Sequence, residues 1–278
     1  AEIASAFLTS EAAISKRLVR ARQRIRELEL PFVVPEPDEL SARLDGVLQT
    51  LYLLFNEGYK ASSGESLVRE ELCREAIRLT TLLTLHPATR LPKVHALLAL
   101  MLLNAARFSG RTDVSGNPLR LSDQDRSAWD HAMIAEGIRQ LGHAASGDQL
   151  SEYHLEAGIA ACHGTAHSDE ATDWPRILSL YDGLWEMTAS PVVALNRAVA
   201  VCKVRGPEAG LEALEGIKSK SVLNSYHLFH AVRGTFEAQL GRFDDALADF
   251  RRAETLASLP GGREFIAARI RECEAGGR

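Results

Sequence analysis

Basic side chains that could contact nucleic acid are concentrated near the start of this 278-residue chain. Lys16, Arg17, Arg20, Arg22 and Arg24 lie within nine residues. Guanidinium and ammonium groups neutralise phosphates, and arginine also hydrogen-bonds base edges. The whole chain carries a net charge of −5, which argues against a uniformly basic nucleic-acid-binding protein. Any electrostatic attraction to nucleic acid is therefore expected at the N-terminal end.

Motifs for catalysis are missing from the sequence. It has no glycine-rich phosphate-binding loop, and the string Gly64–Val68 lacks the closing glycine of a nucleophile elbow. His163 and His167 are four residues apart, but Gly164 between them weakens a helix that would align the two rings. We therefore expect no catalytic residues, no metal site and no cofactor, and interpret the protein as a non-enzyme.

The cysteine and hydropathy patterns favour a cytoplasmic protein. Cys73, Cys162, Cys202 and Cys273 are widely separated and form no Cys-x-x-Cys pair, so reduced thiols are expected rather than structural zinc. The longest apolar stretch, 97–103, is too short to span a bilayer. No basic-then-apolar leader is visible, and no membrane contact is expected.

Apolar residues recur at three- and four-residue steps along most of the chain, which predicts an all-α fold. One predicted helix runs from Leu40 to a stop at Gly58, and residues 93–108 predict a buried central helix. Residues 122–125 resemble a capping box that opens a further helix reaching Ile138. Only residues 112–121 could form a short hairpin or an irregular loop.

Two helix pairs are predicted near the C-terminus. The first spans 193–217 with a turn at Gly206, and the second spans 226–258 with a turn at Gly241. The two glycines are 35 residues apart, close to the period of about 34 in tetratricopeptide repeats. An ordinary antiparallel helix bundle with accidental spacing is the alternative, because only two repeats are visible and about three are normally needed.

Residues 2–28 fit a helix-turn-helix unit. A short helix over 2–8 is followed by a turn at Thr9 and Ser10, where Ser10 can cap a second helix over 11–28. Six apolar residues could form its inner face: Ile3, Phe7, Leu8, Ile14, Leu18 and Ile25. The opposite face carries the basic side chains. The alternative is a solvated basic helix that has no partner.

The N-terminal sequence resembles region 4 of bacterial sigma factors of the extracytoplasmic-function type. The resemblance rests on Glu2-Ile3-Ala4, Phe7, Ser10, Ile14 and the string 17–26 (Arg-Leu-Val-Arg-Ala-Arg-Gln-Arg-Ile-Arg). Strings at 52–59, 123–130 and 191–198 are similar to one subgroup of these factors, whose members carry a long C-terminal extension with tetratricopeptide-like repeats. Together the matches span most of the chain, but region 2 and the front of region 4 are not found in it.

This resemblance implies a fold, partners and site residues. It implies a partial helix-turn-helix at 1–30, a Pro-rich linker at 31–37, a helical extension domain at 38–189 and tetratricopeptide-like helical repeats at 190–278. Promoter DNA and the RNA polymerase core are the implied partners, through recognition of the −35 promoter element. The implied DNA-binding residues are Ser10, Glu11, Ser15, Lys16, Arg17, Arg20, Arg22 and Arg24. The alternative function is a tetratricopeptide-like protein-interaction module without promoter recognition.

Two polar strings in the middle of the chain are a candidate regulatory or partner surface. They consist of Asn56, Glu57 and Tyr59, and of Gln124, Asp125 and Arg126. Capping of helix ends explains most of these residues individually. The alternative is a shared cleft in which Arg126 pairs with Glu57, and Tyr59 and Gln124 meet a ligand, the polymerase or the sigma domains.

Overall fold

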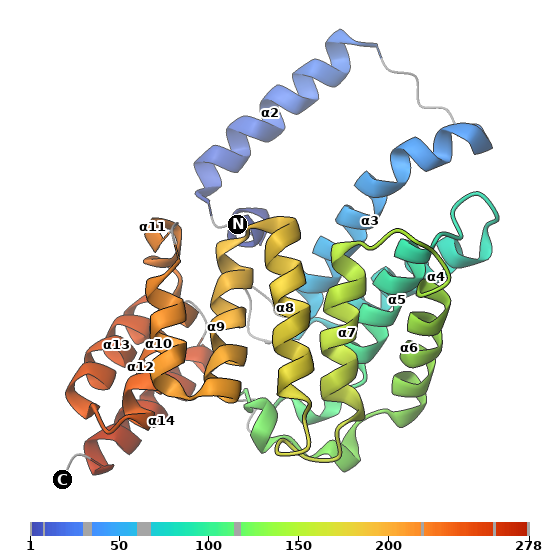
Figure 1. The fold of residues 1–278 in the computed structure, drawn as a ribbon. Helices are drawn as coiled ribbons and strands as arrows, with labels where there is room; N and C mark the ends of the chain where they lie inside the picture. The colour runs from blue at the N-terminus through green and yellow to red at the C-terminus, as the bar shows by residue number, and fades with distance from the viewer. Residues whose placement is uncertain are drawn as a thin grey trace.

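The computed structural model describes residues 2–7, 9–29, 35–59, 68–113, 118–217, 220–257 and 260–276, and in these ranges the fold is all-α, as predicted. Figure 1 shows one helical body from which a single long helix projects. The helices of the N-terminal half are α1 (Glu2–Ala6), α2 (Glu11–Glu27), α3 (Pro37–Tyr59), α4 (Glu70–Leu85), α5 (Pro92–Ala105) and α6 (His131–Ala144). Three short 3-10 turns separate α5 from α6: η1 (Phe108–Gly110), η2 (Leu121–Asp123) and η3 (Arg126–Ala128).

The C-terminal half is a succession of helices that pack on their neighbours in the sequence. They are α7 (Glu152–Thr165), α8 (Trp174–Thr188), α9 (Pro191–Arg205), α10 (Pro207–Glu215), α11 (Lys220–Leu223), α12 (His227–Gln239), α13 (Phe243–Leu256) and α14 (Pro260–Gly276). In Figure 1, α7, α8, α9 and α10 lie side by side, with α12, α13 and α14 behind them. Helices α8 and α9 also pack against each other across residue 190, the predicted domain boundary.

The largest hydrophobic core surrounds α5, whose residues from Val94 to Ala105 are almost all buried. The predicted central helix is thus confirmed, although it ends at Ala105 rather than at residue 108. Leu48, Leu97 and Met101 are completely or almost completely buried in this core, between α3 and α5. Smaller cores continue along the chain, between α7, α8 and α9, then around α10 and α12, and finally between α12, α13 and α14.

Both predicted turn glycines adopt the conformation that favours glycine. Gly206 has φ +94° between α9 and α10, and Gly241 has φ +73° between α12 and α13. Residues with a Cβ rarely adopt positive φ, so the sequence signal for these two turns is local. Asp173 also caps α8 as predicted, since its carboxylate accepts a hydrogen bond from the Arg176 amide at 3.0 Å.

The helix predicted to stop at Gly58 ends one residue later, at Tyr59, but the glycine has a further role. It is buried within the last turn of α3, and its carbonyl accepts a hydrogen bond from the Arg69 amide at 2.7 Å. A Cβ at this position would lie 2.7 Å from Cys73 Sγ and 2.9 Å from Arg69 O. The glycine therefore allows α3 and α4 to approach closely.

The helix predicted to open at residues 122–125 begins later, at His131. Asp125 caps the 3-10 turn η3 instead, by accepting a hydrogen bond from the Ser127 amide at 2.9 Å. Asp130 then caps α6 through the Met133 amide at 2.8 Å. These side-chain bonds to nearby amides compete with a continuous helix and divide the segment. Within the possible hairpin at 112–121, residues 114–117 lie outside the described residues, and Thr112 forms a bridge with Pro118.

Candidate nucleic-acid interface and polar junction

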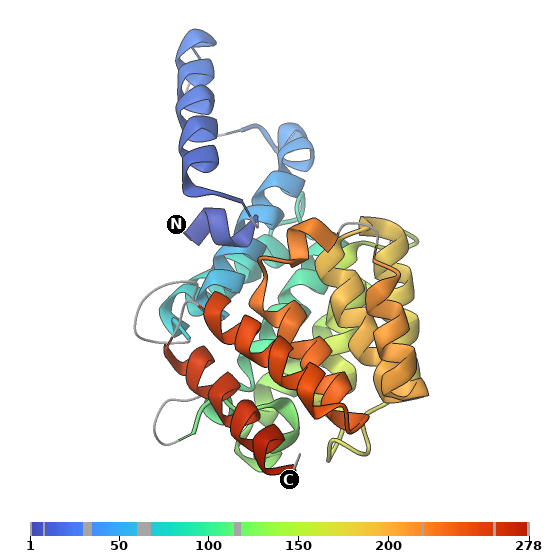
Figure 2. The same ribbon diagram turned by 90° about the vertical axis from the view of Figure 1, so that its left-hand side faces the viewer.

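Helix α2 begins where the sequence predicted. The Ala13 amide donates a hydrogen bond to Ser10 Oγ at 3.2 Å, so Ser10 is the N-cap of the helix. Its hydroxyl is therefore committed to the helix start. In Figure 2, α2 stands apart from the rest of the molecule, whereas the short helix beside the N-terminus lies against it.

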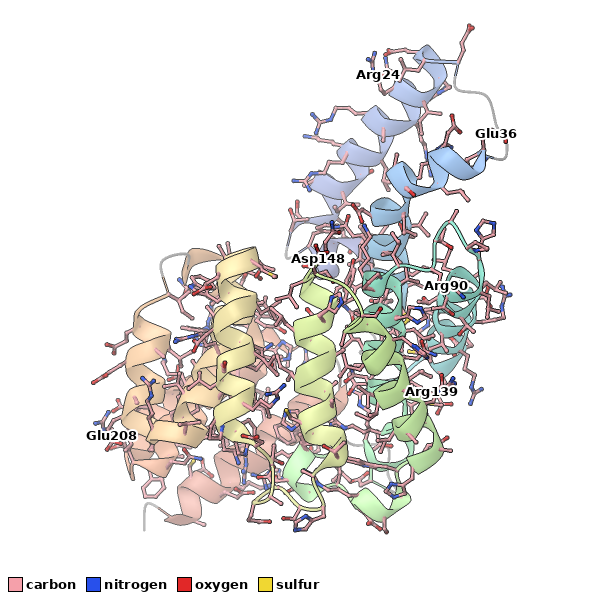
Figure 3. All side chains as sticks on the ribbon, turned by 45° about the vertical axis from the view of Figure 1, so that its right-hand side comes forward. Arg24, Glu36, Arg90, Arg139, Asp148 and Glu208 are labelled. Carbon is pink, nitrogen blue, oxygen red and sulfur yellow. The ribbon has the colours of Figure 1, made fainter. Side chains whose placement is uncertain are left out.

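All eight implied DNA-binding residues are exposed to solvent. Lys16, Arg20 and Arg24 are four residues apart and share one face of α2. Within the described part of the chain, Lys16 and Arg20 form no ion pair, while Arg24 Nη1 lies 3.8 Å from Glu27 Oε2. Figure 3 shows Arg24 near the end of α2 that is farthest from the body. Lys16 and Arg20 therefore form a cationic surface that no described acidic side chain neutralises.

The predicted inner face of the helix-turn-helix is not covered in the structure. Ile3, Phe7, Leu18 and Ile25 are between 41% and 51% exposed, and Leu8 lies outside the described residues. Among the described members of this predicted face, only Ile14 is buried. A helix-turn-helix unit needs further helices against such a face, and the described residues supply none. The described residues thus supply the apolar face but no helices that cover it.

The short helix α1 connects this unit to the body. Ala4 is buried, and α1 contacts α3. Glu2 Oε1 lies 2.8 Å from Arg69 Nη1, at the start of α4. The position of the helix-turn-helix unit is thus tied to the helices that follow it.

Tyr59 ends α3 inside a cluster of aromatic and basic side chains. Its ring stacks on Phe55 at a centroid distance of 5.8 Å and lies 6.1 Å from the ring of Phe108. The Arg111 guanidinium covers the same ring at 3.7 Å and donates a hydrogen bond to the Tyr59 carbonyl oxygen. Burial lowers the pKa of Arg111. This contact satisfies a carbonyl at the end of α3.

Gln124 is buried on the other side of the same loop. Its side-chain oxygen accepts hydrogen bonds from Arg107 Nε at 3.4 Å and Nη2 at 3.3 Å, and its amide donates to Leu119 O at 3.2 Å. Arg107 also lies 5.3 Å above the centre of the Trp129 ring. Residues 107–111 thus connect Tyr59 with Gln124, and we call Tyr59, Arg107, Arg111, Gln124 and Trp129 the polar junction.

Arg126 does not pair with Glu57 as hypothesised. Its guanidinium donates to His163 O at 2.7 Å and to Ala166 O at 2.9 Å, at the C-terminal end of α7. The same group lies 4.0 Å from Asp169 Oδ1. Cations stabilise the exposed carbonyls at helix ends. The carbonyls at the end of α7 are therefore the partners of Arg126, in place of Glu57 on α3.

The remaining members of the two polar strings have separate positions. Asn56 hydrogen-bonds the Tyr52 side chain, on the part of α3 that faces Glu156 of α7. Asp125 is exposed and caps η3, and Glu57 is half-buried on α3. Sequence reasoning missed Arg107 and Arg111, although two arginines beside an aromatic residue directly after a buried helix are a usable signal for a capped junction.

His163 and His167 do not lie on one helix face, as a metal site at this spacing would require, because α7 ends at Thr165. Burial, together with Arg107 and Arg126, lowers the pKa of His163 to about 4. Its ring packs against Trp174 at a centroid distance of 5.3 Å. Within the described ranges, no group of three or more His, Cys, Asp or Glu side chains could hold a metal ion.

Comparisons with known proteins place the chain near proteins without an assigned activity. Residues 43–145 match a family of unknown function (DUF6596). Over 266 residues the chain is 42% identical to an uncharacterized protein of Rhizobium meliloti (strain 1021), and the match covers 95% of the chain and 62% of that protein. The chain thus spans less than two thirds of the length of this relative. No solved structure matches it. Among the described helices, none is long and apolar enough to cross a membrane.

Proposed function

We propose that this chain is the C-terminal part of a bacterial sigma factor of the extracytoplasmic-function type, in which α2 contacts the −35 promoter element. The observation that carries the proposal is the exposed basic face of a well-capped helix, formed by Lys16, Arg20 and Arg24. A helix of this kind can enter the major groove, where arginine reads guanine and phosphates are neutralised. Catalysis has no part in this function, and the cytoplasm is the compartment that it requires.

The exposed apolar side of α2 supports the same proposal. Leu18 and Ile25 lie on the face opposite Lys16 and Arg20, so one side of the helix is suited to DNA and the other to supporting helices. In the complete protein, additional N-terminal helices would cover that side, and the RNA polymerase core would be the principal protein partner. The greater length of the Rhizobium relative is compatible with such a segment.

Residues 38–278 act in this proposal as a helical extension that supports or controls promoter recognition. The contact between Glu2 and Arg69 and the burial of Ala4 give the extension a physical route to the helix-turn-helix unit. A change in the packing of α3 against α4 would alter the position from which α2 reaches DNA.

The second candidate function is a protein-interaction module of the tetratricopeptide-like type. It is favoured by the consecutive helix pairs with glycine turns at Gly206 and Gly241. A Cβ at Gly234 would lie 3.1 Å from Ala246 O, so α12 and α13 approach as closely as such pairs require. This function requires no sequence preference for DNA.

Selection of duplex DNA from a random pool distinguishes the two functions. The experiment uses the protein expressed from its complete reading frame, with RNA polymerase core present. The sigma-factor proposal predicts enrichment of a common sequence, and loss of that enrichment on Arg20→Ala/Arg22→Ala. Arg251→Ala/Arg271→Ala is the matched control, because both arginines are exposed and lie on α13 and α14. Recovery of DNA without a shared sequence would favour the interaction module.

A further inference from the structure

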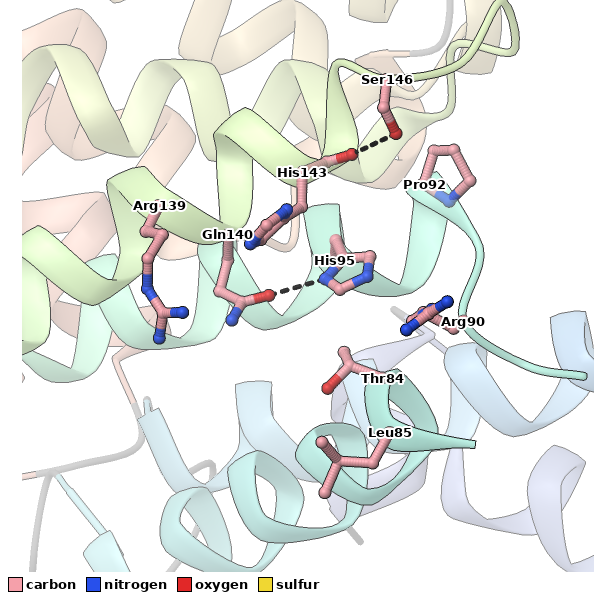
Figure 4. Close-up of a pocket in the computed structure, with 9 residues that line it drawn as sticks. All are labelled: Thr84, Leu85, Arg90, Pro92, His95, Arg139, Gln140, His143 and Ser146. Carbon is pink, nitrogen blue, oxygen red and sulfur yellow. Dashed lines mark hydrogen bonds between the residues drawn. The ribbon is translucent and has the colours of Figure 1, made fainter. Parts of the chain in front are cut away.

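A cleft between α4, α5 and α6 lies outside the residues used above. Its volume is about 370 Å³, within the size range of small-ligand sites. Figure 4 shows the side chains that line it, which include Arg90, His95, Arg139, Gln140 and His143. No Asp or Glu is among the lining residues. The lining therefore favours an anion over a cation.

Hydrogen bonds fix the orientation of His95 in this cleft. The Gln140 amide nitrogen donates to Glu136 Oε1 at 2.7 Å, so the side-chain oxygen of Gln140 is the atom that faces His95 Nδ1, at 2.7 Å. An oxygen can only accept, so Nδ1 of His95 carries a hydrogen. The chain from Glu136 through Gln140 holds the ring with its other nitrogen available to a ligand, on the side of Arg90 in the view of Figure 4.

The helix ends around the cleft have mixed polarity. Pro92 is the first residue of α5, and this positive helix end has no acidic residue in its first turn and no capping side chain. The negative ends of α4 and α6 are moderated by hydroxyl groups. Thr89 Oγ1 donates to Leu83 O at 2.7 Å, and Ser146 Oγ donates to His143 O at 2.7 Å.

Of the two arginines that line the cleft, Arg90 supplies the positive charge for a bound anion. Arg139 is paired with Glu136, whereas Arg90 forms no ion pair within the described part of the chain. An exposed guanidinium is suited to bidentate contact with an oxyanion. Figure 3 shows Arg90 and Arg139 on the body of the molecule, away from Arg24 on α2.

We propose that this cleft binds a small molecule that carries an oxyanion, either a phosphate ester or a carboxylate. Arg90 and His143 bind the oxyanion at the mouth of the cleft, and the oriented ring of His95 forms part of its wall. The apolar part of the molecule packs on Leu85 and Pro92. The extension is thus a ligand-binding unit, whatever the role of α2.

Calorimetric titration with three matched probes tests the proposal: phenyl phosphate, benzoate and phenol. Binding of phenyl phosphate, of benzoate or of both, without binding of phenol, is the expected result, and comparison of the two anions identifies the preferred group. Arg90→Ala/His143→Ala should weaken binding by at least about 10-fold, since charge-assisted hydrogen bonds are lost. Both side chains are exposed, so the variant should remain folded.

Two further variants serve as controls. Arg74→Ala removes an exposed arginine of α4 that pairs with Glu70 outside the cleft, and Arg20→Ala/Arg22→Ala removes charge from α2. Both should bind the anions as the unmodified chain does. Absence of anion binding, equal binding of phenol, or loss of binding only in the α2 variant would each overturn the proposal.

Discussion

The Arg111 guanidinium covers the Tyr59 ring at 3.7 Å and donates a hydrogen bond to the carbonyl oxygen of the same residue. One side chain therefore joins the C-terminal end of α3 to the loop that follows α5. Arg107, four residues earlier, holds Gln124 and lies over Trp129. The polar junction is consequently a structural element, with its polar groups directed toward the protein itself.

Replacement of Arg111 by alanine should destabilise the fold by about 2–3 kcal/mol, because a buried carbonyl and an aromatic ring lose their cationic partner. Urea unfolding monitored by circular dichroism measures this loss. Arg78→Ala is the control, since Arg78 is exposed and pairs only with Glu75 on the surface of α4. An equal effect of the two substitutions would contradict a structural role for Arg111.

Gly58→Ala should destabilise the protein by about 1–3 kcal/mol, because the new methyl group would overlap Cys73 Sγ and Arg69 O. Gly46 lies in the same helix and is exposed, and a methyl group added to its Cα would have no other atom within 4 Å. Gly46→Ala should therefore stabilise by about 0.5–1 kcal/mol through helix propensity. Changes of the same sign in thermal unfolding would contradict the close approach of α3 and α4.

Ala246→Leu should cost roughly 1–3 kcal/mol, because Ala246 is completely buried between α12 and α13 and a larger side chain would separate them. Ala248 lies on the same helix but is exposed, so Ala248→Leu should change the unfolding free energy by less than about 0.5 kcal/mol. Similar stability of both variants would indicate a loosely packed helix pair.

The sequence predicts features of this fold that depend on neighbouring residues. The turns at Gly206 and Gly241 could be predicted from the sequence, because each turn requires a positive φ that glycine adopts readily. The further role of Gly58 could not be predicted, because it depends on Arg69 and Cys73, which belong to another helix.

The same limit applies to the candidate sites. The basic face of α2 follows from helical spacing alone, and the structure leaves it exposed. By contrast, the partner of Arg126 could not be predicted, because the end of α7 competes with Glu57 only after the helices have packed. The orientation of His95 likewise depends on Gln140, which is 45 residues away in the sequence.

The contribution of Glu156 to the stability of the protein should fall as the pH rises from about 5 to 7. Burial raises the pKa of this carboxyl to about 7, against the opposing effect of the hydrogen bond from Tyr52. A glutamate in an unfolded chain titrates near about 4.3, so the folded state binds the proton more tightly. The stability that protonation confers is complete below the unfolded pKa and is lost as the pH rises through the folded pKa.

Unfolding free energies of Glu156→Gln and the unmodified chain isolate this contribution. His163, whose pKa is lowered to about 4, acts in the opposite sense in both proteins and cancels in the comparison. The difference between them should change by roughly 1–3 kcal/mol between pH 5 and 7. Glu212→Gln, an exposed change on α10, should not alter the pH profile in this way. Parallel profiles for Glu156→Gln and the unmodified chain would show that Glu156 is ionised throughout this range.

The salt dependence of DNA binding by this chain tests the role of α2 most directly. Four phosphate or base contacts by Lys16, Arg17, Arg20 and Arg24 predict a slope of about −4 for the logarithm of the binding constant against the logarithm of salt concentration. Fluorescence anisotropy with a short duplex at low ionic strength measures that slope. Arg20→Ala/Arg24→Ala should reduce it to about −2, while Arg251→Ala/Arg271→Ala should leave it unchanged. An unchanged slope in the α2 variant would contradict the assignment of this helix as the DNA-binding element.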